Sequence, residues 1–122
     1  MAVRILIVED DILVATCIKE MLAASGFNVV GIAGSAFEAL SAAEAHRPTL
    51  ALVDIRLAGQ MDGIDLACLL RDKLSVPAIF LTGLADTDVV NRAVVARPLG
   101  FLRKPFRPSQ VFNAVEAALA PS

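Results

Sequence analysis

Short aliphatic runs recur along the chain, and longer stretches that mix apolar and polar residues separate them. The runs are rich in β-branched or aromatic residues and are mostly uninterrupted, which is typical of strands buried on both faces of a sheet. This pattern predicts five strands, at Val3–Val8, Phe27–Ala33, Thr49–Val53, Ala78–Leu81 and Gly100–Leu102.

In the stretches between the runs, apolar residues recur every three or four positions, as they do along one face of an amphipathic helix. They predict five helices, at Asp11–Ala24, Ser35–His46, Asp62–Leu74, Asp86–Ala96 and Pro108–Leu119. Capping signals agree with several of these bounds. The candidates are Asp11 as an N-cap, Ser35 with Glu38 as a capping box, Gly26 as a left-handed C-cap and Pro108 in a first turn.

Strands that alternate with helices predict parallel pairing through right-handed crossovers, with helices on both faces of the sheet. The fold class is therefore α/β, a three-layer, doubly wound (βα)5 domain with a five-stranded parallel sheet. The chain has 122 residues, which is one domain's length and enough to bury a core without disulfides. We expect a single domain over residues 1–122.

Composition and charge narrow the function classes. Hydrophobic residues make up 57% of the chain and charged residues 20%, which excludes an intrinsically disordered segment. The net charge of −2 offers no electrostatic footprint for nucleic acid or an anionic membrane. Cys17 and Cys68 are too few for a disulfide scaffold or a zinc site, and both are predicted to be small buried helix residues. The sequence has neither a signal-peptide pattern nor a membrane-spanning stretch, so we expect a cytoplasmic protein.

Polar groups gather where the predicted strands end. In open parallel sheets, ligands bind beyond the carboxyl ends of the strands. Each group has an ordinary interpretation by itself, as a helix cap, a turn former or a solvated charge, but the fold would bring all of them to one edge. They are Glu9, Asp10 and Asp11 after the first strand, Asp54 after the third, Thr82 and Gly83 after the fourth, and Arg103, Lys104 and Pro105 after the fifth.

Four stretches in this order resemble the receiver domain of two-component response regulators, and the resemblance covers essentially the whole chain. It implies a flavodoxin-like sheet of order 2-1-3-4-5 and a stand-alone single-domain response regulator. A receiver excised from a larger regulator or hybrid kinase is the alternative. The stretches are Ile5–Asp11, Leu52–Leu57, Ile79–Gly83 and Gly100–Phe106.

The resemblance makes Asp54 the phosphoacceptor, which takes a phosphoryl group from the phosphohistidine of a histidine kinase or histidine phosphotransfer protein. It also implies Mg²⁺, bound directly by Asp10 and Asp54, by Glu9 more often through water, and by the backbone carbonyl of Arg56. The chemistry fits, because crowded carboxylates need a cation and hard oxygen ligands suit Mg²⁺. Such a chain is a signalling phosphoacceptor rather than an enzyme, and catalyses only its own phosphorylation and slow autodephosphorylation.

By the same resemblance, Lys104, the Thr82 hydroxyl and the Gly83 N–H hold phosphoryl oxygens. Pro105 follows Lys104 through a cis bond that turns the lysine inward. Thr82 and Phe101 switch the surface of the fourth helix, fifth strand and fifth helix, which controls a downstream protein partner. Plain core packing is the alternative for Phe101. Receivers often dimerise through this surface, so the resemblance also allows a homodimer.

Three features depart from the family pattern. The loop over residues 58–63 is slightly longer than usual and lacks its Pro, and Arg97-Pro98 stands where a Gly-Ala step is common. These leave open the shape of the pocket lip and of the output surface. Arg56 and Leu84 occupy positions that influence the access of hydrolytic water in receivers, and they predict slow loss of the phosphoryl group.

Two other functions are alternatives to the receiver. A small phosphohydrolase of the haloacid-dehalogenase type also uses Asp, Thr, Lys and Mg²⁺, but it places its nucleophile in an Asp-x-Asp motif after the first strand. A pseudo-receiver that binds partners without phosphorylation is disfavoured by the intact set of Asp54, Thr82 and Lys104. His46 has no kinase motif near it and is better explained as a cation at a helix C-terminus.

Overall fold

Strands and helices alternate along the chain in the computed structural model, which describes residues 3–83 and 86–120. The strands are β1 (Arg4–Val8), β2 (Asn28–Ala33), β3 (Leu50–Asp54), β4 (Ala78–Thr82) and β5 (Gly100–Arg103). The helices are α1 (Ile12–Ala24), α2 (Ala36–His46), α3 (Gly63–Leu74), α4 (Thr87–Arg92) and α5 (Pro108–Leu119), with the 3₁₀ turn η2 (Ala93–Ala96) after α4. The predicted elements are all present, and apart from the end of the fourth helix their bounds differ by no more than one residue.

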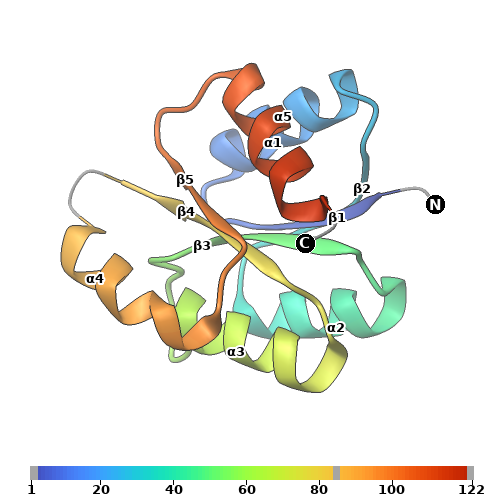
Figure 1. Ribbon diagram of the computed structural model, residues 1–122. Coiled ribbons are helices and arrows are strands. Elements are labelled where there is room, and N and C mark those ends of the chain that lie inside the picture. Colours follow the sequence, from blue (N-terminus) through green and yellow to red (C-terminus); the bar gives the residue numbers. More distant parts are fainter. Residues whose placement is uncertain (1–2, 84–85, 121–122) are drawn as a thin grey trace.

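The strands form one parallel sheet with the order β2-β1-β3-β4-β5 (Figure 1). This confirms the expected flavodoxin-like order. The chain runs from β1 outward to β2, and then returns past β1 to build β3, β4 and β5. The order therefore reverses between β1 and β3, and the carboxyl ends of these two strands flank the crevice in which such sheets bind ligands.

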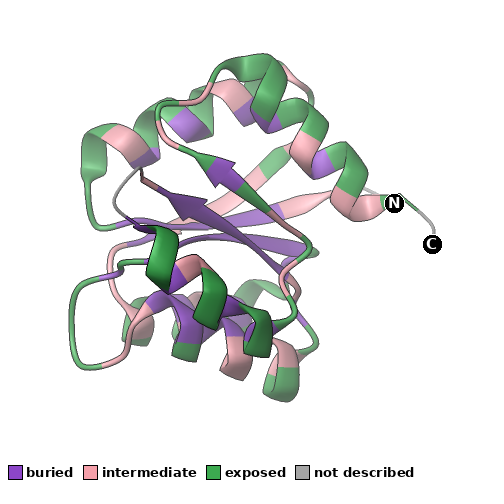
Figure 2. Ribbon diagram, turned by 60° about the vertical axis from the view of Figure 1, so that its left-hand side comes forward, coloured by how far each residue is buried: buried purple, intermediate pink, exposed green. Residues whose placement is uncertain are grey.

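Two helical layers enclose the sheet. Helices α1 and α5 cover one face, and α2, α3 and α4 cover the other (Figure 1). Figure 2 shows the buried sheet between helices whose outer sides are exposed. Alternate residues of β1 serve the two layers: Ile5 and Ile7 pack in the cluster with α1 and α5, whereas Leu6 and Val8 pack in the cluster with α2 and α3. This two-sided burial explains the uninterrupted aliphatic runs.

The predicted caps are largely confirmed. Asp11 Oδ1 accepts hydrogen bonds from the backbone N–H groups of Leu13 (3.0 Å) and Val14 (3.4 Å). Gly26 has φ of +88° directly after the C-cap of α1, a conformation that favours glycine.

Only one of the two hydrogen bonds of the predicted capping box of α2 is present. Ser35 Oγ accepts from the N–H of Glu38 at 3.2 Å, as predicted. The Glu38 carboxylate, however, accepts from the N–H of Gly34 at 3.4 Å, one residue earlier than a capping box requires.

The fourth predicted helix is shorter than expected. It is α-helical only to Arg92 and then tightens into η2. Pro98 disfavours a right-handed helical conformation at the residue before it, and Arg97 takes φ of +48°. The Val95 carbonyl accepts from Arg71 Nη1 of α3 at 2.9 Å, which anchors the turn to the neighbouring helix. The Arg97-Pro98 step therefore does reshape this corner.

The prediction for the cysteines is wrong for Cys17, which is exposed, and only partly right for Cys68, which is half-buried. Cys17 lies one residue before the buried Ile18, on the flank of α1 that borders an open hollow beside the loop after β5. None of the described helices is both long enough and apolar enough to cross a bilayer.

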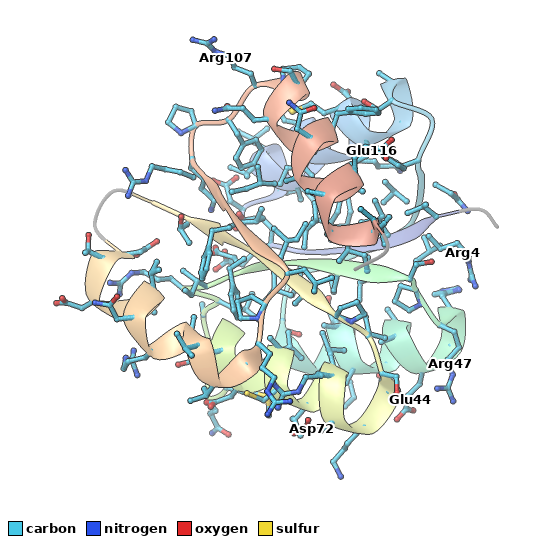
Figure 3. All side chains as sticks on the ribbon, viewed as in Figure 1. Arg4, Glu44, Arg47, Asp72, Arg107 and Glu116 are labelled. Carbon is cyan, nitrogen blue, oxygen red and sulfur yellow. The ribbon has the colours of Figure 1, made fainter. Side chains whose placement is uncertain are left out.

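Three charged residues, the half-buried Arg4 and the exposed Glu44 and Arg47, lie at the opposite end of the strands from the predicted site (Figure 3). Figure 3 places Arg4, Glu44 and Arg47 at the end of the sheet where β1 begins, and Arg4 Nη1 donates to the Arg47 carbonyl at 3.4 Å. These groups lie far from the carboxyl ends of the strands, where the predicted site residues are.

Candidate functional site

Three carboxylates meet where β1 and β3 end. Glu9 and Asp10 directly follow β1, and Asp54 is the last residue of β3. One carboxylate oxygen from each residue lies within 4.8 Å of the others, so the three could share a metal ion. Glu9 and Asp54 are buried, whereas Asp10 is exposed. The cluster is therefore open to water on one side, as suits a cation that keeps part of its hydration shell.

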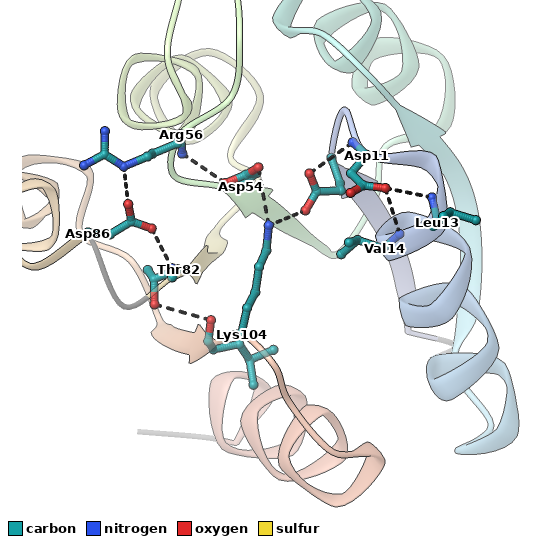
Figure 4. A network of polar contacts seen from close by, with 11 residues as sticks. Asp11, Leu13, Val14, Asp54, Arg56, Thr82, Asp86 and Lys104 are labelled. Carbon is teal, nitrogen blue, oxygen red and sulfur yellow. Dashed lines mark hydrogen bonds and ion pairs between the residues drawn. The ribbon is translucent and has the colours of Figure 1, made fainter.

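Lys104 reaches into this cluster from the loop after β5. Its Nζ lies 2.7 Å from Glu9 Oε1 and 3.5 Å from Asp54 Oδ2 (Figure 4). The backbone N–H of Lys104 donates to the Thr82 carbonyl at 2.6 Å, which fixes the start of the loop against β4. The Lys104-Pro105 peptide bond is cis, as the resemblance implied. The lysine thus places an ammonium beside the buried carboxylates.

The ion pair changes the acidity of both partners. Burial raises the pKa of Glu9 to about 7, and the Lys104 ammonium offsets only part of that effect. Burial would lower the pKa of Lys104, but the carboxylates of Glu9 and Asp54 outweigh it and hold that pKa above its usual value. Lys104 is therefore a permanent cation at this edge of the sheet.

The end of β4 supplies a hydroxyl and a backbone donor. Thr82 is buried, and its Oγ1 lies 3.5 Å from the Leu102 carbonyl of β5. Gly83 follows at once, and its N–H points toward the Asp86 carboxylate. Leu84, which was predicted to influence water access, lies outside the described residues.

Arg56 is the second residue of the β3–α3 loop, and its backbone N–H donates to Asp54 Oδ1 at 3.0 Å. The Arg56 Nε donates to Asp86 Oδ1, so its side chain points across to the start of α4 (Figure 4). The two ends of this one residue thus contact two acids on different elements.

Asp86 is a site residue that the sequence analysis missed. It is only 5% exposed and accepts from both Gly83 N–H and Arg56 Nε. Burial would raise the pKa of Asp86, but the Gly83 hydrogen bond and the Arg56 guanidinium hold it below its usual value. Because an Asp at a predicted helix start is ordinarily a cap, nothing in its sequence position distinguished it.

Gly63 is a second residue that was missed. It is the first residue of α3, and it lies so close to the end of β3 that a Cβ atom here would collide with the Asp54 carbonyl oxygen. The same Cβ would lie 3.0 Å from the Asp54 carbonyl carbon and the Ile55 Cα. The position therefore requires glycine for close approach of two backbones.

Phe101 is not simply a core residue. It is 42% exposed, and its ring centroid lies 6.0 Å from that of the buried Phe80 in β4. The register pairs Phe80 with Phe101 and Thr82 with Arg103, so Phe101 and Thr82 lie near each other on adjacent strands. The ring therefore packs against the core on one side and is partly open to solvent, on the strand next to the buried hydroxyl.

The assembled edge thus holds three carboxylates, an ammonium, a hydroxyl and a backbone N–H. The acids can bind a hard cation, and the ammonium, hydroxyl and backbone N–H can donate hydrogen bonds to the negative oxygens of a phosphoryl group. Asp54 is the one acid that contacts both Lys104 and the β3–α3 loop. With the exception of Leu84, which lies outside the described residues, the predicted site residues therefore lie in this cluster of polar groups or directly beside it.

Comparison with known proteins gives the same family. The model of the response regulator receiver domain matches residues 5–116. The transcriptional regulatory protein PdtaR of Mycobacterium tuberculosis is 38% identical over 117 residues, which cover 96% of this chain and 57% of that protein. The phyllosphere-induced regulator PhyR of Methylorubrum extorquens is 35% identical over 120 residues, which cover 98% of this chain and 44% of that protein. The chain spans about half the length of these curated relatives.

Solved structures agree with the sequence comparisons. The signal receiver domain of a modulated diguanylate cyclase from Desulfovibrio desulfuricans G20 has a TM-score of 0.91 and 34% identity, and the match covers 98% of this chain and 94% of that one. The receiver domain of NtrX from Brucella abortus has a TM-score of 0.89 and 26% identity, covering 97% and 99%. The chain belongs to the family of response regulator receiver domains.

Proposed function

We propose that this receiver domain takes a phosphoryl group from the phosphohistidine of a histidine kinase or histidine phosphotransfer protein onto Asp54. The observation that carries the proposal is the position of Asp54, whose carboxylate contacts Lys104 within a cluster of two further acids. Receiver domains of response regulators are signalling proteins, and a carboxylate is a competent nucleophile for such a transfer.

In the transfer, one carboxylate oxygen of Asp54 forms a bond to phosphorus while the bond from phosphorus to the donor's imidazole nitrogen breaks. The imidazole leaves and takes a proton from solvent, and the product is an aspartyl phosphate. Catalysis consists mainly of positioning and charge neutralisation, because the transition state is loose and its charge lies on the equatorial oxygens. Lys104, Thr82 Oγ1 and the Gly83 N–H are the donors for those oxygens.

The residues present fit Mg²⁺. Glu9, Asp10 and Asp54 would hold it, together with the backbone carbonyl of Arg56. When bound, the ion offsets the negative charge of the carboxylates and of the incoming phosphoryl group. The exposed Asp10 leaves an approach for the ion from solvent. Lys104 remains the cation that the chain itself supplies.

The signal leaves through the surface of α4, β5 and α5. Phosphorylation draws Thr82 toward the phosphoryl group, and Phe101 turns into the space beside it, so the surface changes shape as a shift between two states. Four large apolar side chains are exposed on η2 and β5 and the turn between them, which supports docking of a downstream protein there. They are Val94, Val95, Leu99 and Phe101.

The test uses acetyl phosphate as a small phosphodonor with Mg²⁺, followed by intact mass. We expect one added phosphate in the wild-type chain and none in Asp54→Asn. Asp65→Asn, which removes an exposed acid on α3, is the matched control and should be phosphorylated normally. An adduct that survives Asp54→Asn contradicts the proposal. Steady turnover of many phosphomonoesters would favour the hydrolase, and no adduct from any donor would favour the pseudo-receiver.

A further inference from the structure

The buried carboxylate of Asp86 joins three parts of the site. Its Oδ2 accepts from the Gly83 N–H at 2.5 Å, and its Oδ1 accepts from Arg56 Nε (Figure 4). Gly83 directly follows β4, Arg56 lies two residues after the end of β3, and Asp86 immediately precedes α4. The carboxylate therefore ties the start of α4 to both strand ends that form the site.

Asp86 does not act as a helix cap, although it occupies the N-cap position. Its side chain accepts no hydrogen bond from the first turn of α4 and reaches back to Gly83 instead. A buried acid is costly unless its hydrogen bonds are made, so these two contacts hold the side chain in place. Its partners are also neighbours of the phosphoacceptor, because the Arg56 N–H donates to Asp54 Oδ1.

We infer that Asp86 is an internal stand-in for the phosphoryl group: its carboxylate occupies the Gly83 N–H in the unphosphorylated chain and must release it when Asp54 is phosphorylated. The inference rests on the proposed function, which gives this N–H to a phosphoryl oxygen. One backbone N–H directed at a new anion cannot keep a full hydrogen bond to a second one. The two negative groups also repel each other across the same small site.

This competition would connect the chemistry to the output surface. When the hydrogen bond from the Gly83 N–H to Asp86 breaks, the start of α4 is no longer held to the end of β4. The ligand can shift the equilibrium only by its differential interaction with the two states, and the lost or regained Gly83 bond is such a difference. Asp86 thus opposes phosphorylation and at the same time holds α4 in its resting position.

The experiment measures the affinity of Asp86 variants for beryllofluoride, a phosphoryl analogue, with Mg²⁺ by calorimetric titration. We expect Asp86→Ala to bind about tenfold more tightly than the wild-type chain, because a competing charged hydrogen bond is gone. Asp86→Asn should also bind more tightly, but by less, since its amide oxygen still accepts a hydrogen bond. Asp88→Asn is the matched control: it removes an exposed acid two residues further on, and its affinity should equal that of the wild-type chain.

A second measurement needs no variant. In the wild-type chain, added beryllofluoride should change the Gly83 amide and Asp86 carboxyl resonances together and speed amide exchange over residues 87–92. Unchanged Asp86 resonances, or equal or weaker binding by Asp86→Ala, would overturn the inference while leaving the proposed function intact. If the wild-type chain takes no beryllofluoride, the proposed function itself fails and the inference falls with it.

Discussion

Lys104 Nζ lies 2.7 Å from Glu9 Oε1, although 95 residues separate the two in the sequence. The contact joins the loop after the last strand to the end of the first. Glu9 is almost fully buried, and its ammonium partner is 29% exposed. The ammonium of Lys104 therefore offsets the negative charge of the buried Glu9, which lies beside the carboxylates of Asp10 and Asp54.

Replacement of Lys104 by Met should lower the free energy of unfolding by about 1–3 kcal/mol in the absence of Mg²⁺, because the buried Glu9 loses its ammonium partner. The loss is limited because Lys104 is partly exposed, so solvent already screens the ion pair. Added Mg²⁺ should restore more stability to the variant than to the wild-type chain. Urea unfolding with and without Mg²⁺ measures both effects. Lys73→Met, at an exposed position on α3, is the control and should change little; equal stability of all three chains would contradict the prediction.

Gly63→Ala should destabilise the fold by about 3 kcal/mol or more, since its Cβ would meet the backbone at the end of β3 and force a helix or a strand to move. The shift would also displace Asp54. Gly100→Ala is the matched control, because a Cβ there meets nothing within 4 Å. Thermal unfolding of the two variants should differ clearly, and a Gly63→Ala chain as stable as Gly100→Ala would refute the close approach.

Cys17 should react with an alkylating reagent in the native protein much faster than Cys68. Cys17 is exposed and lines a surface hollow of about 590 Å³ with Val14, Met21 and Phe106, whereas Cys68 is half-buried on α3. Peptide mapping after brief alkylation measures the two rates, and Cys17→Ser should leave only the slow site. Equal rates would show that α1 does not present this side chain to solvent.

The phosphoryl group on Asp54 should be lost slowly, with a half-life well beyond seconds at neutral pH. Of the two positions behind this expectation, Arg56 is described, and its guanidinium is paired with the buried Asp86. Intact mass at intervals after removal of acetyl phosphate measures the decay, with Asp65→Asn as a control of equal rate. Loss within seconds would contradict the prediction.

The sequence predicted the elements well because buried parallel strands leave uninterrupted aliphatic runs and the helices carry clear caps such as Asp11. The predicted strand ends also placed Glu9, Asp54 and Lys104 at one edge. The strand order came from resemblance to a family, since alternation alone does not fix the order in which parallel strands pair.

What the sequence did not predict depends on side chains meeting across elements. Asp86 reads as a helix cap, and only the folded chain shows that it turns back to Gly83 and across to Arg56. Gly63 lies where the predicted loop meets the predicted helix, and its role follows from how closely α3 approaches β3. The exposure of Cys17 depends on which arc of α1 is turned away from the sheet, and one residue of rotation decides it.

The strand order has a consequence for how the site comes into being. Its groups come from the ends of β1, β3, β4 and β5, so the site spans the chain from Glu9 to Lys104 and no short segment contains it. Contacts so distant in sequence form late and slowly, because long loops must close first. During synthesis, Asp54 emerges well before Lys104, and it meets its cation only when β5 has joined the edge of the sheet. Only a domain whose last strand has joined the sheet would then be able to carry a phosphoryl group on Asp54.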